Sequence, residues 1–262
     1  MSEDRGTVPA ALTAVAVVIP ANDEEELLPR CLEALDAAVD ALRRSDPSLA
    51  ITAVVVLDAC TDGSGDVAAG HAVHVRSIEE RCVGAARTVG AAAAHDLLGI
   101  GVEHDGARVW LACTDADSVV PANWLTEHVS SARAGVDLVL GRVRPDPLDL
   151  DEDTHREWSR LHRSGHPTGH VHGANLGVRW SAYAAAGGFA HVPEHEDVLL
   201  VEAVLAAGAR VGPGPEILTS GRRTGRVAGG FSGYLQDLGA ERSGWSAGEP
   251  EGVRQGPWGL RS

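Results

Sequence analysis

The chain of 262 residues contains no lysine, and this absence limits its chemistry. Every fixed positive side chain is an arginine, so reactions that depend on a lysine are excluded. Acidic residues outnumber arginines by 37 to 22, which gives a formal net charge of -15. Binding to nucleic acid needs a concentrated positive face. The composition therefore argues against nucleic-acid binding, and an anionic ligand would have to be held by a metal ion or by a few arginines.

The cysteines lack the spacing of a zinc site or of a disulfide framework. They are Cys31, Cys60, Cys82 and Cys113, and no two of them form a C-x-x-C pair. Zinc sites and disulfide frameworks show clustered cysteines or histidines at regular spacing. We therefore predict four reduced, mostly buried thiols.

Long apolar runs are also missing from the sequence. No stretch approaches the ~20 apolar residues that a membrane span requires. Residues 1–20 carry acids where a signal peptide needs bases. With 44% hydrophobic residues, the chain can still bury a sizeable core. These features predict a cytoplasmic protein with no transmembrane segment.

What the sequence does contain is an alternation of strand and helix patterns. β-Branched runs at 14–19 and 51–57, and a third run that ends at Ala112, are typical of parallel strands buried on both faces. Helix patterns lie between them at 28–44 and 80–95. We therefore expect an α/β fold with a mostly parallel central sheet.

The second half of the chain continues this alternation around one irregular segment, residues 145–171. The patterns predict a helix from Pro121, a strand over 137–143, a helix over 153–162, a strand over 175–179, a helix after Ser181, a helix over 195–208 and a short strand near Ile217. Residues 240–262 are rich in glycine, serine, proline and charge, which predicts a flexible tail.

Acidic residues follow three of the predicted strands. They lie at 20–25 (PANDEE), at 58–63 (DACTDG), and at Asp115 and Asp117 in a D-x-D segment. Ligands of open α/β sheets bind outside the carboxyl ends of the strands. Three acidic loops at that edge would repel each other unless a cation lies among them. Because Mg²⁺ and Mn²⁺ prefer oxygen ligands, we expect Asp115 and Asp117 to bind one of these ions. If side chains alternate there as in a strand, the two carboxylates point in the same direction.

Five stretches of the chain occur in an order that is typical of one enzyme family. They are VVIPANDEEELLPRCLEAL, VVVLDACTDGSGDVA, GAARTVGA, TDADSVVPANWL, and HGANLGVRWSAYAAAGGF followed by EHEDVLL. Together, over residues 14–211, they resemble the family-two glycosyltransferases, which transfer a sugar from a nucleoside diphosphate. The resemblance implies a GT-A type α/β/α sandwich. It also implies a single catalytic domain over 1–239, with a nucleotide-binding half over about 1–120 and an acceptor half over 121–239.

The resemblance implies roles for individual residues. Those that would bind the nucleotide sugar are Pro20, Ala21, Glu24, Asp58, Arg87, Asp115 and Asp117. Among these, Asp58 would accept a hydrogen bond from the base, and Arg87 would contact the donor. Asp115 and Asp117 would hold the ribose and the diphosphate-bound metal. The acceptor side would include His172, Gly173, Asn175 and Glu196.

The catalytic base implied by the resemblance is Asp197, which would deprotonate the acceptor hydroxyl. One positioned carboxylate can supply about 10² to 10⁴ in rate. The alternative for Glu196 and Asp197 is helix capping, since acids favour a first helical turn. Arg222 and Arg223 follow the last predicted strand and could close over the diphosphate, because arginine pairs phosphate oxygens bidentately. The alternative for them is a solvated basic loop.

Three competing interpretations find less support. A haloacid-dehalogenase-type phosphatase also places D-x-D after an apolar strand, but near the start of its fold and with a downstream lysine. Residues 244–248 match the G-x-S-x-G elbow of hydrolases, which needs a later histidine, and none follows His195. A non-catalytic sugar-nucleotide binder would have no use for a base at Asp197.

A zinc site is also weakly supported. The candidate ligands are His162, His166, His170 and His172, but glycine and proline residues between them break any helix that would align them. We therefore predict a metal-dependent hexosyltransferase that favours a UDP-sugar and inverts configuration at the transferred sugar. The sugar and the hydroxyl acceptor stay open.

Overall fold

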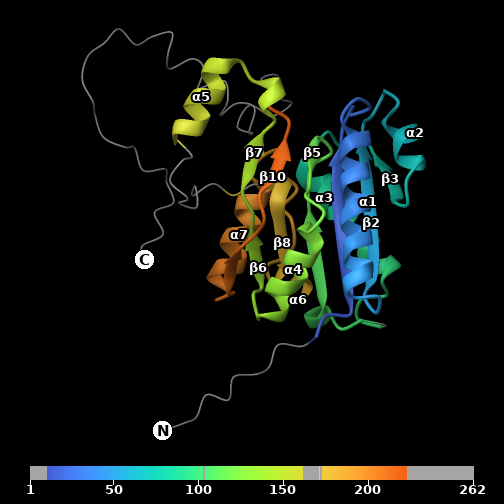
Figure 1. The fold of residues 1–262 in the computed structure, drawn as a ribbon. Helices are drawn as coiled ribbons and strands as arrows, with labels where there is room; N and C mark the ends of the chain where they lie inside the picture. The colour runs from blue at the N-terminus through green and yellow to red at the C-terminus, as the bar shows by residue number, and fades with distance from the viewer. Residues whose placement is uncertain (1–10, 103, 162–170, 172, 223–262) are drawn as a thin grey trace.

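The structure is a computed structural model, and it describes residues 11–102, 104–161, 171 and 173–222. Its main feature is a seven-stranded sheet (Figure 1). In spatial order the strands are β3 (His74–Ile78), β2 (Ala50–Asp58), β1 (Ala14–Ala21), β4 (Val109–Cys113), β8 (Leu176–Arg179), β6 (Leu138–Leu140) and β9 (Val211–Pro213). Of these seven strands, β8 alone runs antiparallel to its neighbours. The predicted mostly parallel sheet is confirmed.

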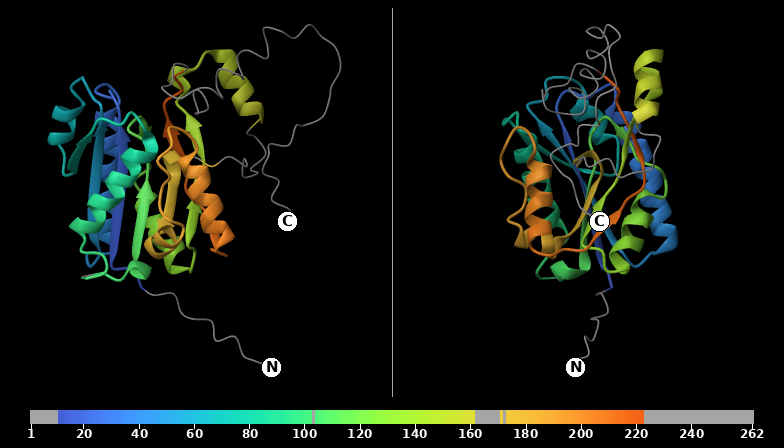
Figure 2. Two further views of the ribbon diagram at one scale, coloured as in Figure 1. Left: turned by 180° about the vertical axis from the view of Figure 1, so that it is seen from behind. Right: turned by 90° about the vertical axis from the view of Figure 1, so that its left-hand side faces the viewer.

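Helices cover both faces of this sheet (Figure 2). On one face lie α1 (Leu28–Ser45), α2 (Ser64–Ala69) and α4 (Trp124–Arg133), and on the other lie α3 (Val83–Leu97), α6 (Trp180–Ala185) and α7 (Glu196–Ala206). Strand β1 shows why two cores form. Its side chains alternate, with Val15, Val17 and Ile19 in the first core and Ala14, Ala16 and Val18 in the second. The predicted α/β/α sandwich is therefore confirmed.

A second, three-stranded sheet stands at the carboxyl edge of the main one. Its strands are β5 (Ser118–Val119), β10 (Ile217–Thr219) and β7 (Val143–Pro145), with β10 antiparallel to β5 and parallel to β7. Beyond it lies α5 (Glu152–Leu161), at the top of Figure 1. The short helices η1 (Gly106–Arg108), η2 (Pro147–Asp149) and η3 (Gly173–Asn175) complete the fold. The pairing of β5 with β10 brings residue 117 beside residues 219–222.

Two predicted helix starts were wrong. The helix expected over 80–95 begins at Val83, because the backbone N–H groups of residues 80–82 donate to the carboxylate of Asp58 instead. The helix expected from Pro121 begins at Trp124, and Asn123 occupies the position before it. In both cases the turn that precedes the helix is longer than the sequence pattern indicates.

The strand expected over 137–143 was also wrong, because two strands in different sheets replace it. Between β6 and β7, the side-chain amide of Asn175 packs against Gly141 so closely that an added Cβ would lie 2.1 Å from Nδ2. The same Nδ2 donates to the carbonyl of Arg142 at 2.9 Å. Asn175 therefore holds the chain where it leaves the main sheet.

Other expectations concern the chain as a whole. None of the four cysteines is in a disulfide, and Cys31 and Cys113 are buried. Among the described residues, no helix has the length and apolar character needed to cross a bilayer. The single domain over 1–239 stays a prediction, and the expected tail over 240–262 lies outside the described residues.

Candidate active site

The loops at the carboxyl edge of the sheet hold strained backbone. Four non-glycine residues of the described chain have a positive φ: Asp23 (49°), Ala59 (53°), Arg81 (49°) and His195 (65°). They follow β1 and β2 and precede α3 and α7. Such conformations cost about 1–3 kcal/mol each and tend to occur at functional sites. This edge is therefore the candidate site.

Hydrogen bonds join the loop after β1 to the loop after β2. Asp23 Oδ1 accepts from the backbone N–H of Thr61 at 2.6 Å, and Asp62 Oδ2 accepts from that of Glu25 at 2.9 Å. In return, the N–H of Gly63 donates to Glu25 Oε2 at 2.7 Å. The acids of these two loops therefore fix each other's backbone.

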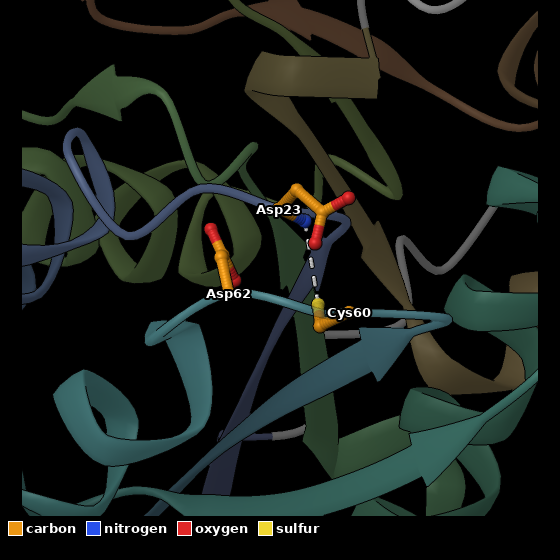
Figure 3. A group of neighbouring side chains, drawn as sticks. All are labelled: Asp23, Cys60 and Asp62. Carbon is orange, nitrogen blue, oxygen red and sulfur yellow. Dashed lines mark hydrogen bonds between the residues drawn. The ribbon is translucent and has the colours of Figure 1, made fainter.

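This junction includes a group with the geometry of a metal site, Asp23, Cys60 and Asp62 (Figure 3). Their ligand atoms lie within 4.8 Å of one another. The two carboxylates already accept backbone N–H groups, however, and burial raises the pKa of the Cys60 thiol, which favours its protonated form. A hard cation also prefers oxygen to sulfur. The group therefore serves as a loop junction.

Asp58, at the end of β2, is buried and orders the loop that leads to α3. Its Oδ1 accepts from the N–H groups of Glu80 and Arg81, both at 2.8 Å, and its Oδ2 accepts from that of Cys82 at 2.7 Å. A carboxylate has about four acceptor positions. One position is left for the predicted hydrogen bond from a base, and that role stays a prediction.

Asp117 and Glu24 meet around Arg222. The guanidinium of Arg222 donates to both oxygens of Glu24, at 2.9 and 2.5 Å, and lies 3.1 Å from Asp117 Oδ2. Upstream of it, the N–H of Ser220 donates to the carbonyl of Asp117 at 3.1 Å. The buried carboxylate of Glu24 and the guanidinium of Arg222, whose side chain is 31% exposed, thus join two segments that lie 198 residues apart in the sequence.

The surroundings of Asp117 suit a cation. Burial, and then the charge of Asp115, raise the pKa of Asp117 to about 7, although Arg222 acts in the opposite direction. A divalent cation beside these oxygens would favour the ionised form. The available donors are carboxylate oxygens, which fit Mg²⁺ or Mn²⁺. The chemistry of Asp115 and Asp117 therefore fits the expected ion.

The two acids of the D-x-D segment bond to different arginines. Strand β4 ends at Cys113, and a turn follows in which the N–H of Ser118 donates to the carbonyl of Asp115 at 3.1 Å, so the strand alternation expected there does not continue. Asp115 Oδ1 accepts from Nη2 of Arg87 at 2.6 Å, whereas Asp117 faces Arg222. The side chain of Asp115 is still 35% exposed, so it remains accessible to a ligand.

Arg87 connects this turn to the start of α7. Its Nη1 donates to Glu196 Oε1, and its side chain is 3% exposed. Burial would lower the pKa of Arg87, but the charges of Asp115 and Glu196 outweigh it and raise this pKa. Burial also raises the pKa of Glu196, against the effect of Arg87. The expected donor contact of Arg87 stays a prediction, since the guanidinium is buried and bonded to two carboxylates.

Asp197, the expected base, is partly exposed at the first turn of α7. Its Oδ2 accepts from the N–H of Gly173 at 2.6 Å, and its Oδ1 accepts from that of Val198 at 2.8 Å. Asp197 thus also accepts a backbone N–H in the first turn of α7, as the helix-capping alternative expects. Each oxygen retains an acceptor position for a hydroxyl group, so Asp197 can also act on an acceptor.

The other expected residues play different parts. Asn175 is 1% exposed, and its amide bonds to Arg142, Pro215 and Trp124, so it holds these segments together, and its expected place on the acceptor side stays a prediction. Pro20 and Ala21 end β1 at the candidate edge. Several expected residues lie outside the described ones: His162, His166, His170, His172, Arg223 and residues 244–248.

Sequence patterns missed the residues that anchor Arg222. Asp149 Oδ2 accepts from the hydroxyl of Ser220 at 3.0 Å and from the N–H of Gly221 at 2.8 Å. Asp146 pairs with Arg30 of α1 at 3.0 Å. The sequence feature that could have indicated them is the group of three aspartates, Asp146, Asp149 and Asp151, beside Pro145 and Pro147.

The fold is an α/β/α sandwich of the GT-A type, and the sequence comparison gives the family. Residues 16–185 match the family described as Glycosyl transferase family 2. The chain belongs to this family, which confirms the resemblance and removes support from the phosphatase interpretation. No curated protein matches the sequence.

Solved structures of low sequence identity share the fold. A mannosyltransferase from Pyrobaculum calidifontis in complex with GDP-Man and Mn²⁺ has a TM-score of 0.57 at 21% identity, over 85% of this chain and 61% of that one. Glucosyl-3-phosphoglycerate synthase from Mycobacterium tuberculosis, with Mn²⁺, UDP and phosphoglyceric acid, has a TM-score of 0.52 at 16% identity, over 90% and 80%.

A third similar structure is residues 1–349 of S. aureus TarS, with a TM-score of 0.56 at 12% identity. The alignment covers 80% of this chain and 61% of that one. The chain thus spans about three fifths of the length of both this TarS fragment and the mannosyltransferase.

Proposed function

We propose that the protein transfers a hexosyl group from a nucleoside diphosphate sugar, with a UDP-sugar favoured, to a hydroxyl acceptor with inversion. The acceptor oxygen forms a bond to the anomeric carbon while the bond to the diphosphate breaks. Asp197 takes the hydroxyl proton, and the nucleoside diphosphate leaves. We propose that the reaction takes place in the cytoplasm.

One observation carries this proposal. Arg87 donates to Asp115 after β4 and to Glu196 at the start of α7. The residue expected to hold the donor and the residue next to the expected base are therefore held by a single side chain. A transfer reaction needs donor and acceptor groups fixed at close range.

The chain's own residues divide the remaining tasks. Asp117 and Asp115 would hold Mg²⁺ or Mn²⁺, which when bound would neutralise the charge that develops on the leaving diphosphate. Pro20, Ala21, Glu24 and Asp58 would line the nucleotide pocket. Gly173, through its N–H, orients the carboxylate of Asp197.

Further residues would complete the acceptor and diphosphate contacts. Glu196, Asn175 and His172 belong to the proposed acceptor side. Arg222 and Arg223 would pair the diphosphate oxygens. The similar structures support a metal ion and a nucleoside diphosphate at such a site, because two of them contain Mn²⁺ with GDP-Man or UDP.

Two measurements test the proposal. Calorimetry should show that UDP binds in the presence of Mn²⁺ and loses most of its signal in EDTA. Asp197→Asn should keep this binding, yet lower the turnover of the UDP-sugar by about 10² to 10⁴, because the amide cannot accept the proton. Glu202→Gln, an exposed position on the same helix, is the matched control and should keep full turnover. UDP binding undiminished by EDTA would contradict the metal assignment.

A further inference from the structure

Arg87 lies where three separate segments meet. It occupies the second turn of α3, and its guanidinium reaches Asp115 in the turn after β4 and Glu196 in the first turn of α7. These partners are 28 and 109 residues away along the chain.

The same guanidinium also lies against Gly173. A Cβ added to Gly173 would lie 1.8 Å from Nη1 of Arg87 and 2.4 Å from Cζ, so an added side chain would have to displace the guanidinium. The N–H of Gly173 donates to Asp197 at 2.6 Å. The position of Arg87 therefore affects Asp197 as well, through the backbone of Gly173.

Burial sets the role that Arg87 can play. Only 3% of its side chain is exposed, and its Nε has no hydrogen-bond partner among the described residues. Its two terminal nitrogens are already committed to two carboxylates. An arginine placed in this way has little exposed surface to offer a nucleotide, but its planar fork can fix two acids at a defined separation.

We propose that Arg87 is a positioning residue that couples the donor side of the site, through Asp115, to the acceptor side at Glu196, Gly173 and Asp197. This inference rests on the proposed function. Its consequence is that occupation of the donor side restricts the first turn of α7. A lysine cannot replace Arg87, because one ammonium group lacks the two separate arms of the guanidinium.

Hydrogen exchange of the full chain tests this coupling, with UDP and Mn²⁺ as the probe. In the unsubstituted protein, binding should slow exchange at the N–H of Gly173 and at residues 196–200 by about fivefold or more, the usual lower range of coupling between sites. In Arg87→Lys at saturating UDP and Mn²⁺, this protection should be lost. Calorimetry establishes saturation in each variant.

The matched control is Arg179→Lys. Arg179 is also a buried arginine, but it bonds to Asp137 and to the carbonyls of Ala107, Ala132 and Val136. Its replacement should affect stability while the protection of Gly173 and α7 persists. If Arg87 has only a structural role, Arg87→Lys and Arg179→Lys should have the same effect on the protection of Gly173 and α7.

Gly173→Ala is a second variant that decides the matter if Arg87→Lys does not fold. It removes no charged group, and the atoms that it displaces belong to the side chain of Arg87 and not to the backbone. The same loss of protection is expected. Protection that persists in Arg87→Lys or Gly173→Ala overturns the inference, as does its absence from the unsubstituted protein with UDP bound. Failure of that protein to bind UDP instead overturns the proposed function, and the inference with it.

Discussion

The site contains two arginines with different surroundings. Arg87 projects from α3, is 3% exposed, and bonds to Asp115 and Glu196. Arg222 follows β10, is 31% exposed, and bonds to Glu24 and Asp117. Each arginine holds one acid of the D-x-D segment, yet only Arg222 lies where solvent and ligands can reach it.

The two arginines offset the repulsion between the acidic loops that converge at this edge. In a chain with no lysine, the two arginines supply the positive charge between the carboxylates. Arg87 is part of the framework, because its partners hold it on both sides. Arg222 is a counter-ion of Glu24 and Asp117 that a cation could displace and that a diphosphate could bind. The comparison therefore separates a fixed half of the site from an exchangeable half.

The largest expected effect is the loss of stability on Arg87→Met. Removing one partner of a buried ion pair costs about 3–5 kcal/mol, because it leaves uncompensated carboxylates. Arg222→Gln should cost about 1 kcal/mol or less, as is typical of partly exposed pairs. Urea unfolding of both variants measures the difference. Equal losses would remove the distinction between the framework and the counter-ion.

The second prediction concerns which acids bind the cation. Asp117→Ala should weaken Mn²⁺-dependent UDP binding by at least about tenfold, or about 1.4 kcal/mol, since it removes an expected metal ligand. Asp62→Ala is the control, because Asp62 belongs to the loop junction with Asp23 and Cys60. Calorimetry with UDP and Mn²⁺ compares them. If Asp62→Ala has the larger effect, the junction is the metal site.

Sequence patterns predicted the parts of the fold that burial determines. β1, β2 and β4 lie within about two residues of their expected places, because strands covered on both faces are continuous apolar runs. β3 was not predicted, since it is an edge strand with largely exposed side chains. Exposure removes the alternation that would reveal a strand.

The candidate site was predicted as a set of residues but not as an arrangement. Glu24, Asp58, Asp115 and Asp117 could be found because they follow strands, whereas Glu196 and Asp197, in the first turn of α7, were indicated by the resemblance. The bond between Glu24 and Arg222, however, joins residues 198 apart, and the contact of Gly173 with Arg87 depends on how α3 and η3 pack. Such contacts follow from tertiary closure, which local patterns do not contain.

The third prediction is that the protein loses folding stability in acid because of His128. This side chain is buried between Trp110 and Trp124, and burial lowers its pKa to about 3. The unfolded chain takes up a proton below about pH 6.5, but the folded chain does not until about pH 3, so stability falls as the pH drops through this window. The slope is about 1.4 kcal/mol per pH unit.

His128→Gln tests this, because glutamine keeps an acceptor for the Nε1–H of Trp110. Urea unfolding at about pH 7 and about pH 5 should show a smaller acid loss in the variant than in the unsubstituted protein. Equal losses in both proteins would show that His128 does not contribute to the pH dependence of folding stability.

The smallest expected effect is on the exchangeable half of the site. Arg222→Gln should raise the affinity for Mn²⁺ alone by about fivefold, because the cation then no longer has to break the ion pair between Arg222 and Asp117. Two unit charges at about 4 Å attract each other by about 1 kcal/mol in water. The same change should lower the affinity for UDP with Mn²⁺, because a pairing group for the diphosphate is lost. Electron paramagnetic resonance of Mn²⁺ measures the first effect, and calorimetry measures the second.

Arg144→Gln is the matched control for this pair of opposite effects. Arg144 is an exposed arginine on β7 that pairs with Glu216 at 3.4 Å, so its replacement removes the same charge away from Asp117. It should change neither affinity by more than about twofold, since exposed charges are screened over about 10 Å. If Arg222→Gln weakens the binding of Mn²⁺ alone, Arg222 supports the cation site instead of competing with the cation, and both arginines belong to the framework.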